Sequence, residues 1–178
     1  MKVNNQVDTS AGASDGKYLD SREMKKNPEG IKVRLFGDAE MGYSKFVEND
    51  DGKIKVVRSV EMPDMEDATE GYQGAEQKAA KCFYIAAWNY ATEAPCLLTL
   101  DKVALINGVL SINDDKDLKS AGDYDLKMTF NSDAAPQDKY KVVRLDATPL
   151  TVTQKKELKA FADTVDLAAH AAGEEVPF

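Results

Sequence analysis

The sequence predicts a single domain that is mainly β (α+β), with several short strands and a helix near the C-terminus. Its 178 residues suffice for one hydrophobic core and are few for two independent domains. Apolar residues make up 43% of the chain and charged residues 30%, a balance typical of a soluble globular protein. Apolar and polar residues alternate in segments from Ile31 to Leu145, and the clearest helical spacing follows Thr151.

The strongest strand prediction falls in a stretch that holds the only Trp, both Cys and the longest apolar runs. Residues 81–90 are rich in aromatic and β-favouring types, residues 91–95 predict a turn, and Cys96 to Leu100 is the expected partner strand. One sheet face would hold Cys82, Tyr84, Ala86, Trp88 and Tyr90. The period alone does not decide whether that face is core or a binding platform.

Residues 1–30 are polar and lack a sustained period, which predicts a flexible N-terminal arm. From residue 31 the pattern changes to a strand that ends at Gly37-Asp38 and is followed by a loop. In this strand the aliphatic Ile31, Val33 and Leu35 alternate with Lys32, Arg34 and Phe36. We therefore expect two cations and an aromatic opposite the core.

Two more strands are predicted on either side of a turn at residues 49–52. Tyr43, Lys45 and Phe46 precede the turn; Lys53 and Lys55 alternate with aliphatics after it, and the facing of Arg58 stays open. Single-stranded nucleic acid needs cations for its phosphates and flat rings for its bases. The alternative is that the lysines solvate an ordinary sheet whose aromatics are core, and this region alone leaves both options equally open.

The rest of the composition argues against catalysis and against metal or cofactor binding. Cys82 and Cys96 stand 14 positions apart without a CxxC pattern, and His170 is the only histidine, so we expect buried reduced thiols and no zinc. Clustered carboxylates can hold a divalent metal, but those at Asp64, Glu66 and Asp67 lack an accompanying Lys or His and predict a solvated loop. No nucleophile–base pair or phosphate loop is present, so we predict no catalytic residue.

Membrane insertion and export are not expected either. No apolar run approaches the roughly 20 residues of a membrane-spanning helix, and the first thirty residues lack the apolar region of a signal peptide. The net charge of −8 argues against a polyanionic partner on average, but an average conceals how the charges are distributed.

The second half of the chain predicts two strands and one or two helices. Residues 101–111 are compatible with a hairpin at Asn107-Gly108 or with a helix capped by Asp101, and local rules leave both open. Strands are expected at residues 123–130 and 139–145. A helix is expected at residues 151–172, capped by Thr151 or Thr153, with an apolar stripe of Leu158, Phe161, Val165 and Ala168.

The sequence ends in an acidic segment at residues 173–178, GEEVPF. Glu174, Glu175, Val176, Pro177 and Phe178 resemble the C-terminal tip of single-stranded DNA-binding proteins, in which acidic residues precede a terminal Pro-Phe. The resemblance implies that this tail recruits replication, recombination or transcription proteins by docking in their basic-rimmed apolar pockets.

The body of the chain carries a second resemblance. The order KCFYIAAWNY, CLLTL, GDYDLKMTF and YKVVRLDATPLT is similar to bacteriophage single-stranded DNA-binding proteins of the OB-fold type, over roughly residues 31–161. Ala121 stands where that family often has an aromatic residue. The resemblance implies an OB-fold-like five-stranded Greek-key barrel at residues 31–150, with one internal helix at 101–111 instead of a hairpin. The N-terminal arm and the C-terminal helix would be additions.

Together these observations predict a non-enzymatic, sequence-independent single-stranded DNA-binding protein. It would act in phage DNA replication, recombination or repair, in the cytoplasm of an infected bacterial host; a homo-oligomer is compatible with this role. The expected phosphate contacts are Lys32, Arg34, Lys45, Lys53, Lys55 and Arg58. The stacking candidates, some of which we expect to be core, are Phe36, Tyr43, Phe46, Tyr84 and Trp88.

Two alternatives stay open. The first is a transcription regulator that uses affinity for single strands to recruit a phage RNA polymerase. The second, of another class, is an acidic β-rich virion or host-takeover protein that binds a protein target. Salt dependence separates DNA binding from the second alternative, because a protein contact does not scale with phosphate neutralisation.

Overall fold

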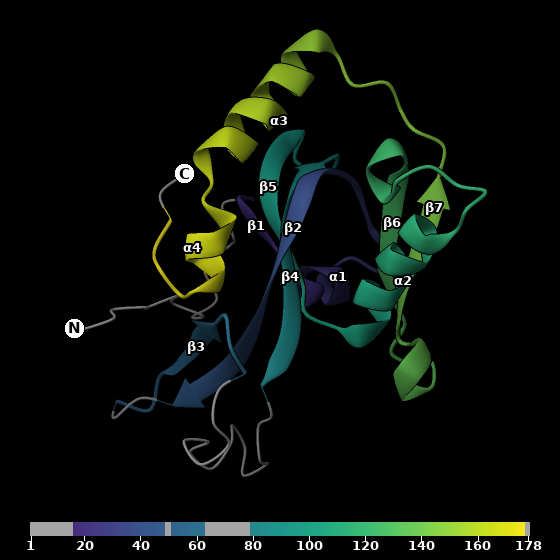
Figure 1. Cartoon of the computed structure of the whole chain (residues 1–178). Helices are drawn as coiled ribbons and strands as arrows, with labels where there is room; N and C mark the ends of the chain where they lie inside the picture. The colour runs from purple at the N-terminus through teal and green to yellow at the C-terminus, as the bar shows by residue number, and fades with distance from the viewer. Residues whose placement is uncertain (1–15, 49–50, 63–78, 177–178) are drawn as a thin grey trace.

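The computed structural model describes residues 16–48, 51–62 and 79–176, which form a mixed α+β structure dominated by one curled sheet (Figure 1). Few helices accompany the strands, and two short 3₁₀ turns lie at Ala121–Asp123 and Pro136–Asp138. In chain order the elements are β1 (Tyr18–Leu19), α1 (Ser21–Lys26), β2 (Ile31–Glu48), β3 (Ile54–Ser59), β4 (Ala80–Asn89), β5 (Ala94–Leu100), α2 (Val103–Asp114), β6 (Asp125–Phe130), β7 (Tyr140–Leu145), α3 (Val152–Thr164) and α4 (Leu167–Ala171).

The sheet has the strand order β1-β5-β4-β2-β6-β7, and β3 pairs with β2. Apart from the parallel pair of β1 and β5, all neighbouring strands are antiparallel. Setting β3 aside, the order β6-β2-β4-β5 is the 4-1-2-3 arrangement of a Greek key, with α2 in the connection that returns the chain to β6. The strands predicted at 81–90, 96–100, 123–130 and 139–145 are confirmed to within a few residues.

Strand β2 is one long element, and the loop predicted after Gly37-Asp38 is wrong. The pairing with β4 shifts between Phe36, opposite Ala86, and Glu40, opposite Tyr84. This irregularity places extra residues on β2 without ending the strand. Gly37 has a φ of 75°, a conformation that glycine adopts without strain, so the residue that predicted a stop instead permits a bulge.

The segment before β2 departs from the predicted flexible arm. Within residues 18–26, β1 adds to the edge of β5, and Asp20 caps α1 by accepting a hydrogen bond from the Arg22 amide at 2.8 Å. Leu19 and Met24 are buried in the main core. Two apolar residues in a polar stretch give no detectable period, which explains why the sequence pattern missed them. Residues 1–15 lie outside the described part of the chain.

Helix α2 confirms the helix that the family resemblance implied for residues 101–111, in place of the hairpin. It starts after Lys102, one residue later than the predicted cap at Asp101. Gly108 lies within it because the helix packs closely on β7: a Cβ at this position would meet Val142 side-chain atoms at 2.8 Å. Tertiary packing therefore overrides the local turn preference of Asn107-Gly108.

The single helix predicted for residues 151–172 is wrong, because the chain forms two helices. Thr151, one of the two caps that the sequence allowed, makes a reciprocal capping box with Gln154 at the start of α3. The helix ends at Thr164, and the backbone becomes extended at Val165. Asp166 then caps α4 by accepting a hydrogen bond from the Ala169 amide at 2.9 Å. A second N-cap residue within the apolar stripe is thus what divides it.

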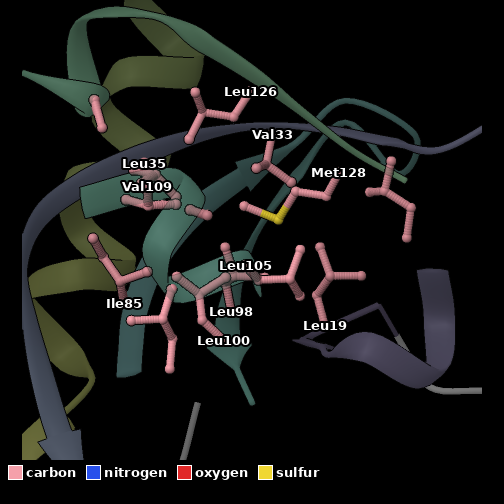
Figure 2. Packing of buried hydrophobic residues seen from close by; sticks show 14 of the residues in the cluster. Leu19, Val33, Leu35, Ile85, Leu98, Leu100, Leu105, Val109, Leu126 and Met128 are labelled. Carbon is pink, nitrogen blue, oxygen red and sulfur yellow. The ribbon is translucent and has the colours of Figure 1, made fainter. Parts of the chain in front are cut away.

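Hydrophobic residues lie on both faces of the sheet. The larger cluster lies between the sheet and the helices α1 and α2; Figure 2 shows Leu105 and Val109 of α2 against Val33, Ile85 and Leu98. On the opposite face α3 and α4 cover β4, where Leu158 contacts the Trp88 cluster and Ala171 the Cys82–Tyr84 cluster. Both cysteines are buried and free, as predicted.

Candidate nucleic-acid interface

The side chains of β2 alternate between the two faces as predicted, but two of its cations meet a buried carboxylate. Ile31, Val33 and Leu35 are buried in the main core, and Arg34 pairs across the sheet with Trp88 on one side and Asp125 on the other. Asp125 is fully buried and lies 2.8 Å from Lys32 Nζ and 2.7 Å from Arg34 Nε. Both cations are therefore ion-paired within the chain.

Two neutral groups complete what we call the Asp125 network, formed by Asp125, Lys32, Arg34, Tyr90 and Thr148. The Tyr90 hydroxyl donates to Asp125 Oδ1 at 2.7 Å, and the Thr148 amide donates to Oδ2 at 2.9 Å. Arg34 also donates to the Thr148 carbonyl at 2.9 Å, and Lys32 Nζ lies 4.4 Å from the centre of the Tyr90 ring. The network ties the segment after β7 to the centre of the sheet.

The electrostatics of the network follow from this geometry. Burial acts to raise the pKa of Asp125, but hydrogen bonds from Lys32, the Thr148 amide and Tyr90 outweigh it and lower the pKa to about 2. Burial, with the hydrogen bond to Asp125 next, raises the pKa of Tyr90 to about 12. Asp125 is thus ionised and Tyr90 protonated at neutral pH.

This geometry corrects the roles predicted for Lys32 and Arg34. Their side chains are 33% and 15% exposed, and both are engaged by Asp125. A buried carboxylate needs such partners, because an unpaired charge in the interior is costly. We therefore assign both cations to the fold and not to phosphate contact. The sequence pattern missed this because Asp125 lies 91 positions from Arg34.

Tyr84 and Trp88 are also corrected as stacking candidates, because each is only 1% exposed. Trp88 packs with Leu150 and Leu158, and Tyr84 with Val165 and Ala171. The expectation that some of the aromatics are core is confirmed for these two. The face shared by Cys82, Tyr84 and Trp88 is core because α3 and α4 cover it, which the strand's period could not reveal.

Arg58 and Phe46 lie on the α4 side of the β2–β3 pair. Arg58, opposite Ser44 in the register, donates to the His170 carbonyl at 2.9 Å, so it holds α4 in place. Phe46 is 40% exposed. His170 is buried beside the rings of Tyr18 and Tyr84, and burial, followed by the charge of Arg58, lowers its pKa to about 4. The imidazole is therefore neutral at physiological pH.

Two other predicted residues, Tyr43 and Lys45, lie on the opposite side of the same strands. We call this the Tyr43 surface: Met41, Tyr43 and Lys45 of β2 with Lys81 and Phe83 of β4. The register pairs Met41 with Phe83 and Tyr43 with Lys81, and directly opposite residues share a sheet face. Met41 and Lys81 are exposed, and the other three are half-buried. Lys81 Nζ lies 5.5 Å from the centre of the Phe83 ring.

The predicted single basic and aromatic face is therefore divided between two sides of the sheet. Tyr43 and Lys45 share the Tyr43 surface, whereas Phe46 and Arg58 lie on the other side. Sequence reasoning missed Met41, Lys81 and Phe83 because it followed the phase of Tyr84 and Trp88 along β4. Lys81 and Phe83, which lie on the opposite face of the same strand, place a cation beside an aromatic ring.

Three of the predicted DNA-contacting residues lie outside the Tyr43 surface. Phe36 is 38% exposed and lies at the bulge of β2. Lys53 is exposed next to β3. Lys55 pairs with Val47 in the backbone register, and its side chain lies outside the described part of the structure.

The C-terminal segment is described as far as Val176. Glu174 and Glu175 are exposed, and Val176 packs against the cluster of Cys82 and Tyr84. Pro177 and Phe178 lie outside the described residues. The tail was predicted to begin at residue 173, but contact with the folded domain continues as far as Val176.

Three further observations concern sites that the sequence raised. The carboxylates Asp64, Glu66 and Asp67 fall outside the described residues. Among the residues that are described, no group of three His, Cys, Asp or Glu side chains is placed to hold a metal ion. None of the helices within 16–48, 51–62 and 79–176 is long and apolar enough to cross a membrane.

Comparison with known proteins adds no relative: no family model, curated protein or solved structure matches this chain. Its function is therefore inferred from the residues and their geometry.

Proposed function

We propose that this protein binds single-stranded DNA without sequence preference, through the Tyr43 surface. The carrying observation is that the register places Tyr43 opposite Lys81 and Met41 opposite Phe83, and that the alternation of β2 puts Lys45 on the same sheet face. Cations suit the phosphates, and each base stacked on an aromatic side chain contributes about 1–3 kcal/mol. Tyr43 and Phe83 would stack on bases, and Lys45 and Lys81 would contact phosphates.

The topology supports an OB-fold-like barrel as the scaffold of this function. The Greek-key order of β6, β2, β4 and β5, with α2 before β6, is compatible with the partly open five-stranded barrel of that fold. OB-folds bind oligonucleotides on the face of their second and third strands and on the loop between the first two. Here α3 and α4 cover one face of β4. The Tyr43 surface lies instead where β2 and β4 extend toward their connection.

The biological setting stays a proposal that rests on the resemblance. A phage protein with this activity would act in DNA replication, recombination or repair within an infected bacterial cell. The segment Glu174–Phe178 would recruit partner proteins. Deleting Pro177 and Phe178 should spare DNA binding and abolish recruitment; the cut is placed after Val176 because Val176 packs on the fold.

The test is fluorescence anisotropy of labelled oligo-dT, with a matched duplex as competitor, over a salt series. We expect salt-sensitive binding to the single strand only. Replacing both Lys45 and Lys81 with Ala should lower the slope of log affinity against log salt by roughly 1–1.5, because each phosphate contact on a single strand contributes about 0.7. Tyr43→Ala should weaken binding and leave the salt slope unchanged, because stacking neutralises no phosphate.

The matched control is Lys156→Ala, which removes an exposed lysine of α3 away from the Tyr43 surface. It should change neither affinity nor slope. Lack of binding at low salt would contradict the proposed function and favour a protein target. An effect of Lys156→Ala about half as large as that of the double variant would show that the chain binds through diffuse charge and not through this surface, because the control removes one charge and the double variant two.

A further inference from the structure

A pocket of about 500 Å³ opens beside the bulge of β2, on the same side of the sheet as α2. Its walls are mainly apolar and come from β4 (Phe83 and Ile85) and α2 (Val109 and Leu110), and the polar Asn113 and Ser120 also line it. The carboxyl residues Asp38 and Asp123 also line it, and both are exposed. We call this cavity the bulge pocket.

The bulge pocket is continuous with the Tyr43 surface. Phe83 belongs to both, and its cross-strand partner Met41 precedes Tyr43 by two positions on the same face. A strand of nucleic acid that stacks on Tyr43 and Phe83 would therefore pass the mouth of the pocket. Its phosphates would stay beside Lys45 and Lys81, because the carboxylates of Asp38 and Asp123 repel them.

We infer that the bulge pocket takes one unstacked nucleobase from the bound strand, and that it favours a base with an amino group, such as cytosine. The inference rests on the proposed function and refines it: stacking on the Tyr43 surface is independent of sequence, whereas the pocket adds a preference for one kind of base. A base has two flat apolar faces, which suit walls of Phe83, Ile85, Val109 and Leu110. Its edge carries N–H donors, and carboxylates are the side chains that accept from the cytosine amino group. The volume exceeds that of a single base, so the ring can enter without displacing the core.

The first experiment compares the affinities of labelled oligo-dC and oligo-dT of equal length. Wild-type protein should prefer oligo-dC by about fivefold, because a bidentate contact to a base edge contributes about 1–3 kcal/mol of discrimination and a single acceptor contact is expected at the lower end of that range. Leu110→Trp places a large ring at the pocket mouth, where Leu110 is 40% exposed, and should abolish the preference while leaving oligo-dT affinity unchanged. Val103→Trp, on the exposed side of the same helix, is the matched control and should keep the preference.

A second variant tests the carboxylates. Replacing both Asp38 and Asp123 with Ala should strengthen binding of both oligonucleotides, because two negative charges near phosphates are removed. It should at the same time lower the preference for oligo-dC, because the acceptors are lost. A higher affinity with an unchanged preference would overturn the assignment of these carboxylates to the base edge.

The last measurement separates failure of the pocket from failure of the proposed function. Methyl NMR signals of Ile85, Val109 and Leu110 should shift when free cytidine is added at millimolar concentration, and Leu110→Trp should abolish these shifts. Strong oligo-dT binding without a preference for oligo-dC and without cytidine shifts would overturn the pocket and leave the proposed function standing. Cytidine shifts without any oligonucleotide binding would support the pocket and overturn the proposed function.

Discussion

Two regions of the sheet combine similar residues and differ in the partners that the fold gives them. The Asp125 network and the Tyr43 surface each combine two cations of β2 or β4 with an aromatic residue. In the network, both cations are ion-paired with a buried carboxylate, and the neighbouring Trp88 is covered by Leu158. On the Tyr43 surface, Lys81 is exposed and none of the described carboxylates pairs with it. Composition alone does not separate a binding face from a structural one; the partners supplied by the rest of the fold do.

The most severe test of this contrast is Asp125→Ala. The substitution leaves Lys32 and Arg34 partly buried without their anion, which we expect to lower the free energy of unfolding by about 3–5 kcal/mol. Urea denaturation measures this change. The exposed Asp146→Ala serves as the control and should be nearly neutral. If Asp125→Ala were as mild as the control, the network would not stabilise the fold and Lys32 and Arg34 would again be candidates for phosphate contact.

The next largest effect is expected when the packing of α3 on Trp88 is weakened. Leu158→Ala opens a cavity against Trp88 and should lower the free energy of unfolding by about 2–5 kcal/mol. Val152→Ala changes an apolar residue of the same helix that is 71% exposed, and should have little effect on stability. Oligonucleotide affinity of folded Leu158→Ala should match that of wild type. Tighter binding would mean that α3 hides a binding face on β4, contrary to our assignment.

The strands could be predicted because each carries its own pattern. Alternation in residues 31–36 predicted the buried and outward sides of β2, and the aromatic run at residues 81–90 predicted β4. Capping residues likewise predicted that α3 starts at Thr151 or Thr153, and the structure has the cap at Thr151. The bulge at Gly37 could not be predicted, because the glycine that ends a strand in isolation permits a continuous one when β4 pairs on both sides of it.

The candidate site was harder to predict, because it depends on partners far away in the chain. Tyr43 and Lys45 were identified, but Lys81 and Phe83 became visible only through their register with β2. Arg34 looked like a binding residue because its partner Asp125 is distant in sequence. The facing of Trp88 stayed open because Leu158 of α3, which covers it, is distant in sequence. Local patterns define which residues share a face, whereas long-range contacts define which face is open.

The pH dependence of stability should show two separate windows, one from His170 on the α4 side and one from Asp125 in the network. His170 has its pKa lowered from its ordinary 6.5 to about 4 by burial and then by Arg58, so the unfolded chain binds the proton more readily. Stability should therefore fall by about 3 kcal/mol as the pH drops from 6.5 to 4. The lowered pKa of Asp125 contributes about 2 kcal/mol to the free energy of unfolding above pH 4. This contribution should be lost as the pH falls from 4 toward 2.

Variants assign each window to its residue when unfolding is followed in urea from pH 7 to pH 2. His170→Phe should remove the upper window only, because phenylalanine does not titrate. Asp125→Asn should remove the lower window only, and its free energy of unfolding should be lower than that of wild type at every pH above that window. A wild-type stability that stays constant between pH 6.5 and pH 4 would contradict the neutral buried state of His170.

The smallest expected effect is the most specific, because it contrasts one lysine from each region. Lys81→Gln should leave the free energy of unfolding unchanged within error, since Lys81 is exposed, and should weaken oligo-dT binding several-fold with a shallower salt slope. Lys32→Gln should do the reverse: it removes an ion pair at 2.8 Å from a buried carboxylate, so it lowers stability while the oligo-dT affinity of the folded protein stays near wild type. Urea denaturation and anisotropy, made on the same two preparations, measure both quantities. If both variants lost affinity equally, the net charge of the sheet would govern binding, and the division of its two sides into a structural and a binding region would be wrong.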